Sequence, residues 1–409
     1  MNQIVYTRNY YLDKIRGFYK SDLIKVITGI RRCGKSCFLL SVINDLLNNG
    51  ISEKDIICIN LDKRGYKNIK TPEQLEQLLD EKITDNSFKY IFIDEIQNVS
   101  GFEEVINAFR EEGNCSLFIT GSNSYLLSGE LATKLIGRYI EIEMFPLNFF
   151  EYMEMKQFLG KPLLSVTEEF SEYLRFGGFP KTLEFDNEED KNTYVTSVIH
   201  QILDKDIKKH RKIRNKAVFE KVMTYIINNL GATTNLSNLT DYFNKEENLS
   251  IRSETINSYI EILENAKIIY KCPRFDVKSR KSLRGEQKYY LADLSIYFSR
   301  NVDARINYGP VLENIMYTYL RAKNYHISVG RIGKLECDFI TRKDSEYQYL
   351  QVAMTIMDEK TEEREYKPFE SIRDNYPKYL FTMDPLLQKR NGIHHCNLIN
   401  FIANNKDLE

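Results

Sequence analysis

Residues 26–36 read V-I-T-G-I-R-R-C-G-K-S and contain the spacing G-x-x-x-x-G-K-S. The apolar run 23–28 before the first glycine predicts a strand, and the periodic run 37–47 after the serine predicts a helix. In a strand, glycine-bounded loop and helix, backbone N–H groups can surround phosphate oxygens. The alternative is a chance match in an ordinary glycine turn. The stretch predicts a phosphate-binding loop.

The residue types of this loop suit a nucleotide and a metal ion. Gly29 and Gly34 let backbone N–H groups turn inward, and the helix that starts near Lys35 adds its positive end. Lys35 can reach the β- and γ-phosphates, and the hydroxyl of Ser36 can hold Mg²⁺. We therefore predict that ATP and Mg²⁺ bind here. The predicted nucleotide contacts are Gly29, Ile30, Arg31, Arg32, Cys33, Gly34, Lys35, Ser36 and Cys37. Arg31 and Arg32 could instead face a partner or solvent.

A second apolar run, residues 90–93, ends in two acids. A strand that is apolar on both faces is typical of the centre of a parallel sheet. Asp94 stands where a Mg²⁺ ligand belongs, and Glu95 where a base for the attacking water belongs. The alternative is a pair of solvated turn residues. A strand that ends in Asp-Glu, downstream of the glycine loop, predicts hydrolysis of a nucleoside triphosphate.

Composition limits the remaining classes. The chain has 409 residues, 42% of them hydrophobic and 28% charged, and a formal net charge of -1. This length predicts two or three domains, and any nucleic-acid surface must be local. The seven cysteines include no C-x-x-C pair, which favours a reducing cytoplasm over disulfides or zinc. With no signal-peptide pattern and no run of eighteen apolar residues, we expect a cytoplasmic protein without membrane contact.

Residues 1–150 alternate predicted strands and helices. Further strands are expected at 56–61, 116–120 and 139–144, and further helices at 71–82, 100–112 and 125–136. This alternation predicts an α/β fold with a doubly wound parallel sheet, whose ligands bind at the carboxyl ends of the strands.

Two positions could extend the catalytic site. The strand 117–120 leads into Thr120, Ser122 and Asn123, and in ATPases with an extra central strand a polar residue here contacts the γ-phosphate or the attacking water; the alternative is a polar turn. Arg138 follows the predicted helix 125–136 and could act on the γ-phosphate of its own or a neighbouring subunit. A surface ion pair explains Arg138 equally well. We take Lys35, Glu95, Ser122 and Arg138 as the catalytic candidates, and Ser36 and Asp94 as the metal ligands.

Several motifs carry a family resemblance. They are G-I-R-R-C-G-K-S (29–36), I-F-I-D-E-I-Q (91–97), I-T-G-S-N-S (119–124), R-F-G-G-F-P (175–180), K-Y-Y-L-A-D (288–293), C-D-F (337–339) and Y-L-Q-V (349–352), with the run 135–152. The chain resembles the bacterial and archaeal AAA-type P-loop ATPases that are fused to a C-terminal domain of unknown function. The resemblance covers nearly the whole chain. It implies an ATP-binding protein with ATPase activity, without defining its cellular task.

The C-terminal half divides into three predicted regions. Residues 151–215 are expected to be a helical linker or lid, and residues 216–295 a winged helix-turn-helix, with three helices before a β-ribbon. Two basic runs, 205–216 and 271–288, each hold seven Lys or Arg residues, a pattern typical of binding to duplex DNA. The expected recognition helix offers only Arg252, Ser253, Thr255 and Asn257. The alternative is a winged helix used for packing or protein contact.

Residues 296–409 are predicted to form a mixed α/β domain. An acid on a helix (Glu313), an acid on a strand (Asp338) and Gln351 on the next strand resemble the restriction-endonuclease pattern that holds Mg²⁺. Ala353 stands where that pattern has its lysine, so we expect a nuclease-like domain that is inactive. An ordinary α/β domain with incidental acids explains the same residues.

Two functions remain open at this point. The first is a Mg²⁺-dependent ATPase that couples hydrolysis to a change in a DNA- or protein-binding C-terminal half. The second is a nucleotide-dependent switch or binding module with negligible turnover. A P-loop kinase fits less well, because no acceptor site is recognisable. Duplex DNA and a second copy of the chain are the macromolecular partners that these patterns allow.

Overall fold

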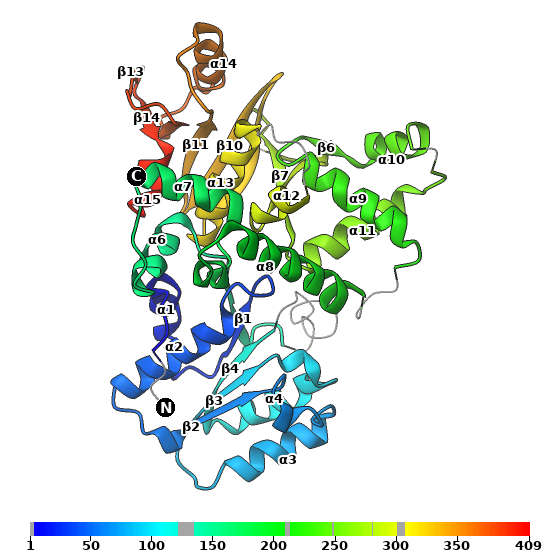
Figure 1. The fold of residues 1–409 in the computed structure, drawn as a ribbon, viewed down its shortest axis with the longest axis vertical. Coiled ribbons are helices and arrows are strands. Elements are labelled where there is room, and N and C mark those ends of the chain that lie inside the picture. The colour runs from blue at the N-terminus through cyan, green and yellow to red at the C-terminus, as the bar shows by residue number, and fades with distance from the viewer. Residues whose placement is uncertain (1–3, 122–134, 209–212, 248, 280, 301–306) are drawn as a thin grey trace. The chain divides into compact units, whose positions relative to one another are not determined.

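The computed structural model describes residues 4–121, 135–208, 213–247, 249–279, 281–300 and 307–409 (Figure 1). The chain forms two compact units, Met1–Phe145 and Pro146–Glu409. The first unit ends near the predicted limit at residue 150. The finer divisions at residues 215 and 295 stay predictions.

The N-terminal unit alternates strands and helices as the sequence predicts. Its strands are β1 (Ile24–Thr28), β2 (Ile56–Asn60), β3 (Lys89–Asp94), β4 (Cys115–Thr120) and β5 (Tyr139–Glu143). Its described helices are α1 (Asn9–Arg16), α2 (Lys35–Asn48), α3 (Pro72–Lys82) and α4 (Phe102–Glu112). The predicted helix 125–136 falls largely outside the described residues.

The strands form one parallel sheet in the order β2-β3-β4-β1-β5. The strand β4 therefore lies between β1, which leads into the glycine loop, and β3, which ends in the acids. The predicted parallel α/β sheet of the P-loop type is confirmed. Since every strand runs in the same direction, the loop and the acids lie at the same edge.

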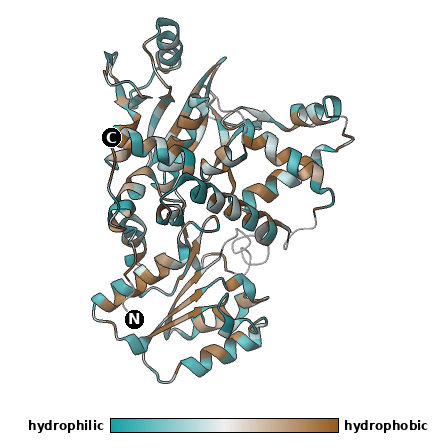
Figure 2. Cartoon of the chain, viewed as in Figure 1, coloured by the Kyte–Doolittle hydropathy of each residue, from teal (hydrophilic) through white to brown (hydrophobic). Residues whose placement is uncertain are grey.

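Both faces of this sheet are covered, which explains the continuous apolar strands. One core packs side chains such as Val26 and Ile91 against α3 and α4. On the other face, Phe92 and Phe118 stack with ring centroids 4.5 Å apart, and Tyr19 packs edge-on against Phe118. Figure 2 shows these strands in the hydrophobic colour. Burial on both sides is the arrangement expected for parallel strands.

The C-terminal unit contains a second, larger sheet. Its helices are α6 (Phe149–Phe158), α7 (Val166–Phe176), α8 (Glu188–Gln201), α9 (Lys216–Asn228), α10 (Leu236–Lys245), α11 (Ser253–Asn265), α12 (Ser295–Arg300), α13 (Tyr308–Ala322), α14 (Glu359–Glu370) and α15 (Leu398–Ala403). Its strands are β6 (Thr234–Asn235), β7 (Ile269–Asp276), β8 (Lys281–Leu291), β9 (His326–Ile332), β10 (Leu335–Lys343), β11 (Glu346–Val352), β12 (Lys378–Thr382), β13 (Lys389–Arg390) and β14 (Ile393–Asn397).

These nine strands form a single mixed sheet in the order β13-β14-β12-β11-β10-β9-β7-β8-β6. The hairpin β7–β8 joins the later strands through a parallel pairing that aligns Arg274–Asp276 with Val329–Arg331. The predicted β-ribbon is therefore longer than expected and continuous with the C-terminal strands. The elements α9, β6, α10, α11, β7 and β8 precede this junction in the order expected of the predicted winged helix.

Two motifs of the C-terminal unit meet at a buried carboxylate. Asp293 accepts hydrogen bonds from the backbone N–H of Gly178 at 2.7 Å and of Ser295 at 2.9 Å. A Cβ atom on Gly177 would lie 1.7 Å from the Asp293 carboxylate, and one on Gly178 would lie 2.0 Å from the carbonyl oxygen of Leu147. Only glycine fits at positions 177 and 178, because the Asp293 carboxylate and the Leu147 carbonyl lie so close to their backbone. These contacts fix residue 147, near the start of the second unit, to Gly178 and Asp293.

Candidate functional site: the glycine loop and the Asp-Glu strand end

The glycine loop has the backbone shape that phosphate binding requires. Gly29 and Gly34 have φ angles of 139° and 106°, values that side chains strongly disfavour. A Cβ atom on Gly29 would also lie 2.1 Å from the carbonyl oxygen of Met144 at the end of β5. Gly34 immediately precedes α2, so the loop delivers its N–H groups to the start of a helix, where anions are stabilised.

Lys35 lies across its own loop. Its ammonium donates to the carbonyl oxygens of Gly29 at 2.9 Å and of Ile30 at 3.1 Å, and the residue is 5% exposed. Nucleotide phosphates offer this ammonium charged acceptors, which form stronger hydrogen bonds than neutral carbonyls. Lys35 can therefore exchange loop carbonyls for phosphate oxygens without leaving the loop.

Neighbouring strands hold Asp94 in one orientation. Asn60 of β2 donates a 2.7 Å hydrogen bond to one carboxylate oxygen, and the hydroxyl of Thr120 on β4 donates to the other. Asp94 is only 4% exposed. Each carboxylate oxygen keeps acceptor capacity beyond these bonds. The Asp94 carboxylate and the hydroxyl of Ser36, which is exposed, are oxygen ligands of the kind that Mg²⁺ prefers.

Glu95 is fixed in an unusual conformation. Its φ and ψ angles of 59° and 46° lie in the left-handed region, which is a strained position for a residue with a side chain. Its backbone N–H donates to the hydroxyl of Thr120 at 3.2 Å, and its carboxylate accepts from the side-chain amide of Gln97. Burial raises the pKa of Glu95, while the charges of Lys35 and Arg31 oppose this rise. A raised pKa suits a general base.

The structure brings most of the predicted site residues together. Arg31 and Lys35 act electrostatically on Glu95, so the loop and the acids form one site. Of the other loop residues, Cys33 is buried, whereas Arg32 and Cys37 are exposed. Ser122, with residues 122–134, lies outside the described residues. Thr120 has a firmer role than the sequence suggested, because it bonds to both Asp94 and Glu95.

Arg138 is not brought to the phosphate loop of its own chain. Its carbonyl oxygen accepts from the N–H of Ile24, at the start of β1, whereas the loop follows the end of that strand. A strand of this length spans about 13 Å. The guanidinium donates to Asn107 at 3.0 Å and lies 3.8 Å from Glu111. This surface interaction is the alternative weighed from the sequence, and action on a neighbouring subunit stays a prediction.

Sequence reasoning missed Arg8 and Tyr11, which connect the loop to the end of the unit. Arg8 donates to the carbonyl oxygens of Cys33 at 3.4 Å and of Phe145 at 2.6 Å, and it is 5% exposed. Tyr11 lies beneath the Arg8 guanidinium, and its hydroxyl accepts from the N–H of Phe145 at 3.2 Å. No local pattern predicts contacts across more than 130 residues of sequence.

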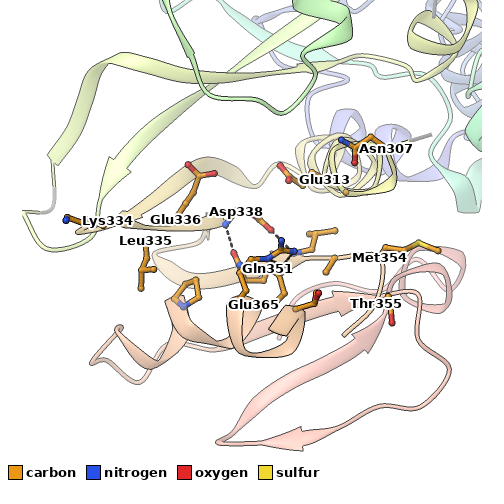
Figure 3. A pocket seen from close by; sticks show the side chains of 16 residues that line it. Asn307, Glu313, Lys334, Leu335, Glu336, Asp338, Gln351, Met354, Thr355 and Glu365 are labelled. Carbon is orange, nitrogen blue, oxygen red and sulfur yellow. Dashed lines mark hydrogen bonds and ion pairs between the residues drawn. The ribbon is translucent and has the colours of Figure 1, made fainter. Parts of the chain in front are cut away.

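The predicted nuclease residues also converge, around a pocket of about 600 Å³ in the C-terminal unit. Glu313 of α13, Asp338 of β10 and Gln351 of β11 line it, as Figure 3 shows, together with Glu336 and Glu365. The backbone N–H of Asp338 donates to Gln351 at 2.7 Å, and Gln351 donates to Glu365 at 2.9 Å. Throughout the described ranges, no three His, Cys, Asp or Glu side chains converge as metal ligands.

Fewer basic side chains of the run 271–288 are exposed for contact with DNA phosphates than the seven in the sequence suggest. Arg274 pairs with Glu286 at 2.6 Å and with Glu336 at 2.8 Å, and Lys288 is buried. Lys271, Lys278 and Lys281 are exposed, while the side chains of Arg280 and Arg284 lie outside the described part. In the run 205–216, residues 209–212 and the side chains of Lys205 and Lys208 likewise lie outside the described part, whereas Arg214 and Lys216 are exposed.

The expected recognition helix, α11, exposes acidic rather than basic side chains. Arg252 precedes it and is exposed, but Glu254 and Glu261 on the helix are also exposed. Asn257 donates to Glu261 at 2.8 Å. A helix with this surface is poorly suited to a negatively charged groove.

Comparisons with known proteins match both units. A family model described as an AAA domain matches residues 21–153, and one described as a domain of unknown function (DUF8612) matches residues 167–303. An uncharacterized protein of Haemophilus influenzae is 35% identical over 93% of this chain and 94% of its own length. An uncharacterized protein of Methanocaldococcus jannaschii is 31% identical over 86% of this chain and 79% of its own length.

Among solved structures, a Walker-type ATPase of Pyrococcus abyssi is 15% identical. The similarity covers 72% of this chain and 95% of that chain, with a TM-score of 0.49. In the described residues, no helix has both the length and the apolar character that a bilayer crossing requires.

Proposed function

Because the chain belongs to the family of AAA-domain proteins that includes these Haemophilus influenzae and Methanocaldococcus jannaschii relatives, we propose that it is a Mg²⁺-dependent ATPase. The observation that carries this proposal is the position of Thr120 between the two acids. Its hydroxyl donates to Asp94, and it accepts from the N–H of Glu95. One side chain on the strand next to the loop strand therefore fixes both a metal ligand and a base.

Each residue has a defined role in this proposal. The loop N–H groups and Lys35 bind the phosphates, while Ser36 and Asp94 would hold Mg²⁺, which would neutralise phosphate charge. Glu95 accepts a proton from the attacking water. Its raised pKa, caused by burial, makes the carboxylate a stronger base. Arg138 would add charge stabilisation only from a neighbouring subunit of a homo-oligomer, because its own guanidinium is tied to Asn107.

We further propose that nucleotide state reaches the C-terminal half through residues 144–147. The N–H of Met144 donates to Thr28 at the start of the loop, at 2.9 Å, and Arg8 ties Cys33 of the loop to Phe145. In the second unit, the N–H of Leu147 donates to Gly178 at 2.7 Å. Hydrogen bonds thus connect the segment 144–147 to the glycine loop at its first residues and to Gly178, which donates to Asp293, at its last residue.

The C-terminal half is proposed to bind DNA or a protein. The order of elements from α9 to β8 supports a winged helix, and the order α13, β9, β10, β11, α14, β12 supports a nuclease-like core. The exposed Lys271, Lys278 and Lys281 favour phosphate contacts, whereas the acidic surface of α11 favours a protein partner. Cytoplasmic location is the expectation that accompanies both.

One observation favours the second candidate, a nucleotide switch with negligible turnover. The Glu95 carboxylate is bonded to Gln97, which competes with a bond to the attacking water. If this bond persists with nucleotide bound, ATP binding alone would set the state of the protein.

Phosphate release separates the two candidates. Purified protein is assayed with Mg²⁺–ATP, with and without duplex DNA, while light scattering measures its size with and without nucleotide. We expect turnover that Lys35→Ala abolishes, because the main phosphate cation is lost. Bound ATP without phosphate release would favour the switch. ATP affinity and turnover that are unchanged in Lys35→Ala would contradict the site.

A further inference from the structure

A lysine that the sequence did not assign to the carboxylate pocket contacts two of the acids that line it, Glu313 and Glu336. Lys288 comes from β8, in the middle of the hairpin that joins the sheet. Its ammonium lies 3.0 Å from an oxygen of Glu313 on α13 and 3.0 Å from an oxygen of Glu336 on β10. Three elements that are distant in sequence thus supply two carboxylates and one cation.

The lysine is buried with these acids. Lys288 is 5% exposed. Burial alone would lower the pKa of Lys288, but the carboxylates of Glu313, Asp338 and Glu336 outweigh it and hold that pKa well above its usual range. The ammonium is therefore charged in the folded protein and compensates the charge of the surrounding acids. An isolated buried carboxylate would be strongly unfavourable.

Donors other than Lys288 also hold the acids around it in place. The hydroxyl of Tyr290 donates to Glu313 at 2.9 Å, and the backbone N–H of Val352 donates to Asp338 at 2.8 Å. Glu336 is fixed from its other side by Arg274 at 2.8 Å. The carboxylates are thus positioned around the ammonium by contacts that do not themselves depend on Lys288.

We propose that Lys288 is the resident cation of this pocket and holds the place at which a divalent metal would bind. The two carboxylates that contact the ammonium, those of Glu313 and Glu336, are hard oxygen ligands, and Mg²⁺ or Mn²⁺ needs only one or two such ligands together with water. Removing the ammonium while retaining these acids converts the pocket into a divalent-metal site. Pairing with Lys288 gives Glu313, an acid of the nuclease-like pattern, a role that needs no metal ion.

Binding of Mn²⁺ to nucleotide-free, full-length protein tests this proposal. Calorimetry and electron paramagnetic resonance compare wild type, Lys288→Met and the double variant Lys288→Met/Glu313→Gln. We expect Lys288→Met to bind one additional Mn²⁺ about tenfold or more tightly than wild type does. The double variant should lose this gain. The phosphate loop contributes the same background to all three proteins.

A matched control is Lys323→Met in the same unit. Lys323 is also buried, but it bonds to Asp407 and to the carbonyl oxygens of Asn405 and Lys406, away from the pocket. It should gain no Mn²⁺ site. A gain of equal size there would overturn the assignment of the site to the pocket.

Three further outcomes decide the proposal. Folded Lys288→Met without a gain in Mn²⁺ binding would overturn it. Mn²⁺ binding by wild type that is lost in Glu313→Gln would also overturn the proposal, because the metal would then bind at Glu313 while Lys288 is present. If Lys288→Met is unfolded in a chelator, refolding with Mn²⁺ decides: recovery of the circular dichroism spectrum supports a metal in the lysine's place, and no recovery overturns it.

Discussion

Arg8 donates a 2.6 Å hydrogen bond to the carbonyl oxygen of Phe145, the last residue of the N-terminal unit. The same guanidinium lies 3.4 Å from the carbonyl oxygen of Cys33 in the glycine loop. A single buried side chain thus bridges the loop and the start of the connection to the C-terminal unit. A change in loop backbone on nucleotide binding would alter one end of this bridge.

We predict that Arg8→Gln separates ATP binding from the response of the C-terminal unit. Hydrogen exchange of the Leu147 and Gly178 amides should change on adding ATP to wild type, and this change should be lost in the variant. ATP affinity should fall by no more than a few-fold. The control is Arg16→Gln, at an exposed position on α1, the helix that Arg8 precedes; Arg16 pairs with Asp45 at 2.8 Å. A full response in Arg8→Gln would contradict the bridge.

Glu95→Gln should keep ATP bound and slow hydrolysis by about 10²- to 10⁴-fold, the usual contribution of a positioned base. The amide is similar in size but accepts a proton poorly. Equilibrium binding and single-turnover phosphate release measure the two effects separately. Loss of ATP binding in this variant would instead make Glu95 a structural residue or a metal ligand.

Local sequence patterns predicted this site because its parts follow short, regular elements. The strand that ends at Thr28 and the strand that ends at Asp94 are both largely apolar, and the glycine loop and the two acids lie at their carboxyl ends. Parallel strands place such positions at one edge of the sheet. The sequence could not predict that the Thr120 hydroxyl joins the acids, since this depends on side-chain orientation on the strand between them.

The C-terminal unit was less predictable for a physical reason. The parallel pairing of β7 with β9 brings together segments that are separated by α12 and α13, and neither strand carries a local signal of its partner. Packing of α13 against β8, also distant in sequence, places Lys288 beside Glu313. A count of basic residues in the run 271–288 therefore includes two, Arg274 and Lys288, whose charges are used inside the fold.

Arg138→Ala tests action across a subunit interface. Because Arg138 lies at the opposite edge of the sheet from its own loop, its loss should leave turnover of isolated monomers unchanged. If copies assemble with Arg138 against a neighbour's nucleotide, turnover should fall by about 10³-fold or more, with little effect on affinity. Mixtures with Lys35→Ala subunits would then recover activity. If no mixture recovers, action in trans is excluded.

Lys25 on β1 predicts a specific pH dependence. It is fully buried, donates to Ser21 and Ser116 at 2.7 and 2.8 Å, and burial lowers its pKa to about 8. Between about pH 8 and 10.5 the unfolded chain therefore binds more protons at this site, so the free energy of unfolding should rise with pH. Relative to Lys25→Met, wild type should gain about 1–3 kcal/mol across this window.

Urea unfolding followed by circular dichroism at several pH values measures this difference. The transition that Mg²⁺–ATP shifts to higher urea belongs to the nucleotide-binding unit, because ligands stabilise the state that binds them. Wild type and Lys25→Met with parallel pH profiles would show that Lys25 stays charged up to its ordinary pKa.

The last prediction concerns duplex DNA. If the predicted wing contacts phosphates, replacing Lys278, Arg280, Lys281 and Arg284 with glutamine should weaken binding to all sequences alike. The slope of log affinity against log salt should fall by about one unit per lost contact. A control variant replaces four exposed basic residues of the N-terminal unit, namely Lys54, Lys63, Arg64 and Lys67. It should change neither the affinity for DNA nor the salt slope.

Base discrimination should be weak, because the start of α11 offers only Arg252, Ser253, Thr255 and Asn257, and the helix carries exposed acids. Wild type should also leave the DNA uncut in Mg²⁺, since Ala353 replaces the lysine of the nuclease pattern and Lys288 pairs with Glu313 and Glu336. Fluorescence anisotropy at low salt, with and without ATP, decides the main point. Undetectable binding in both conditions would reject DNA as the partner, and the acidic face of α11 would then direct the search to a protein.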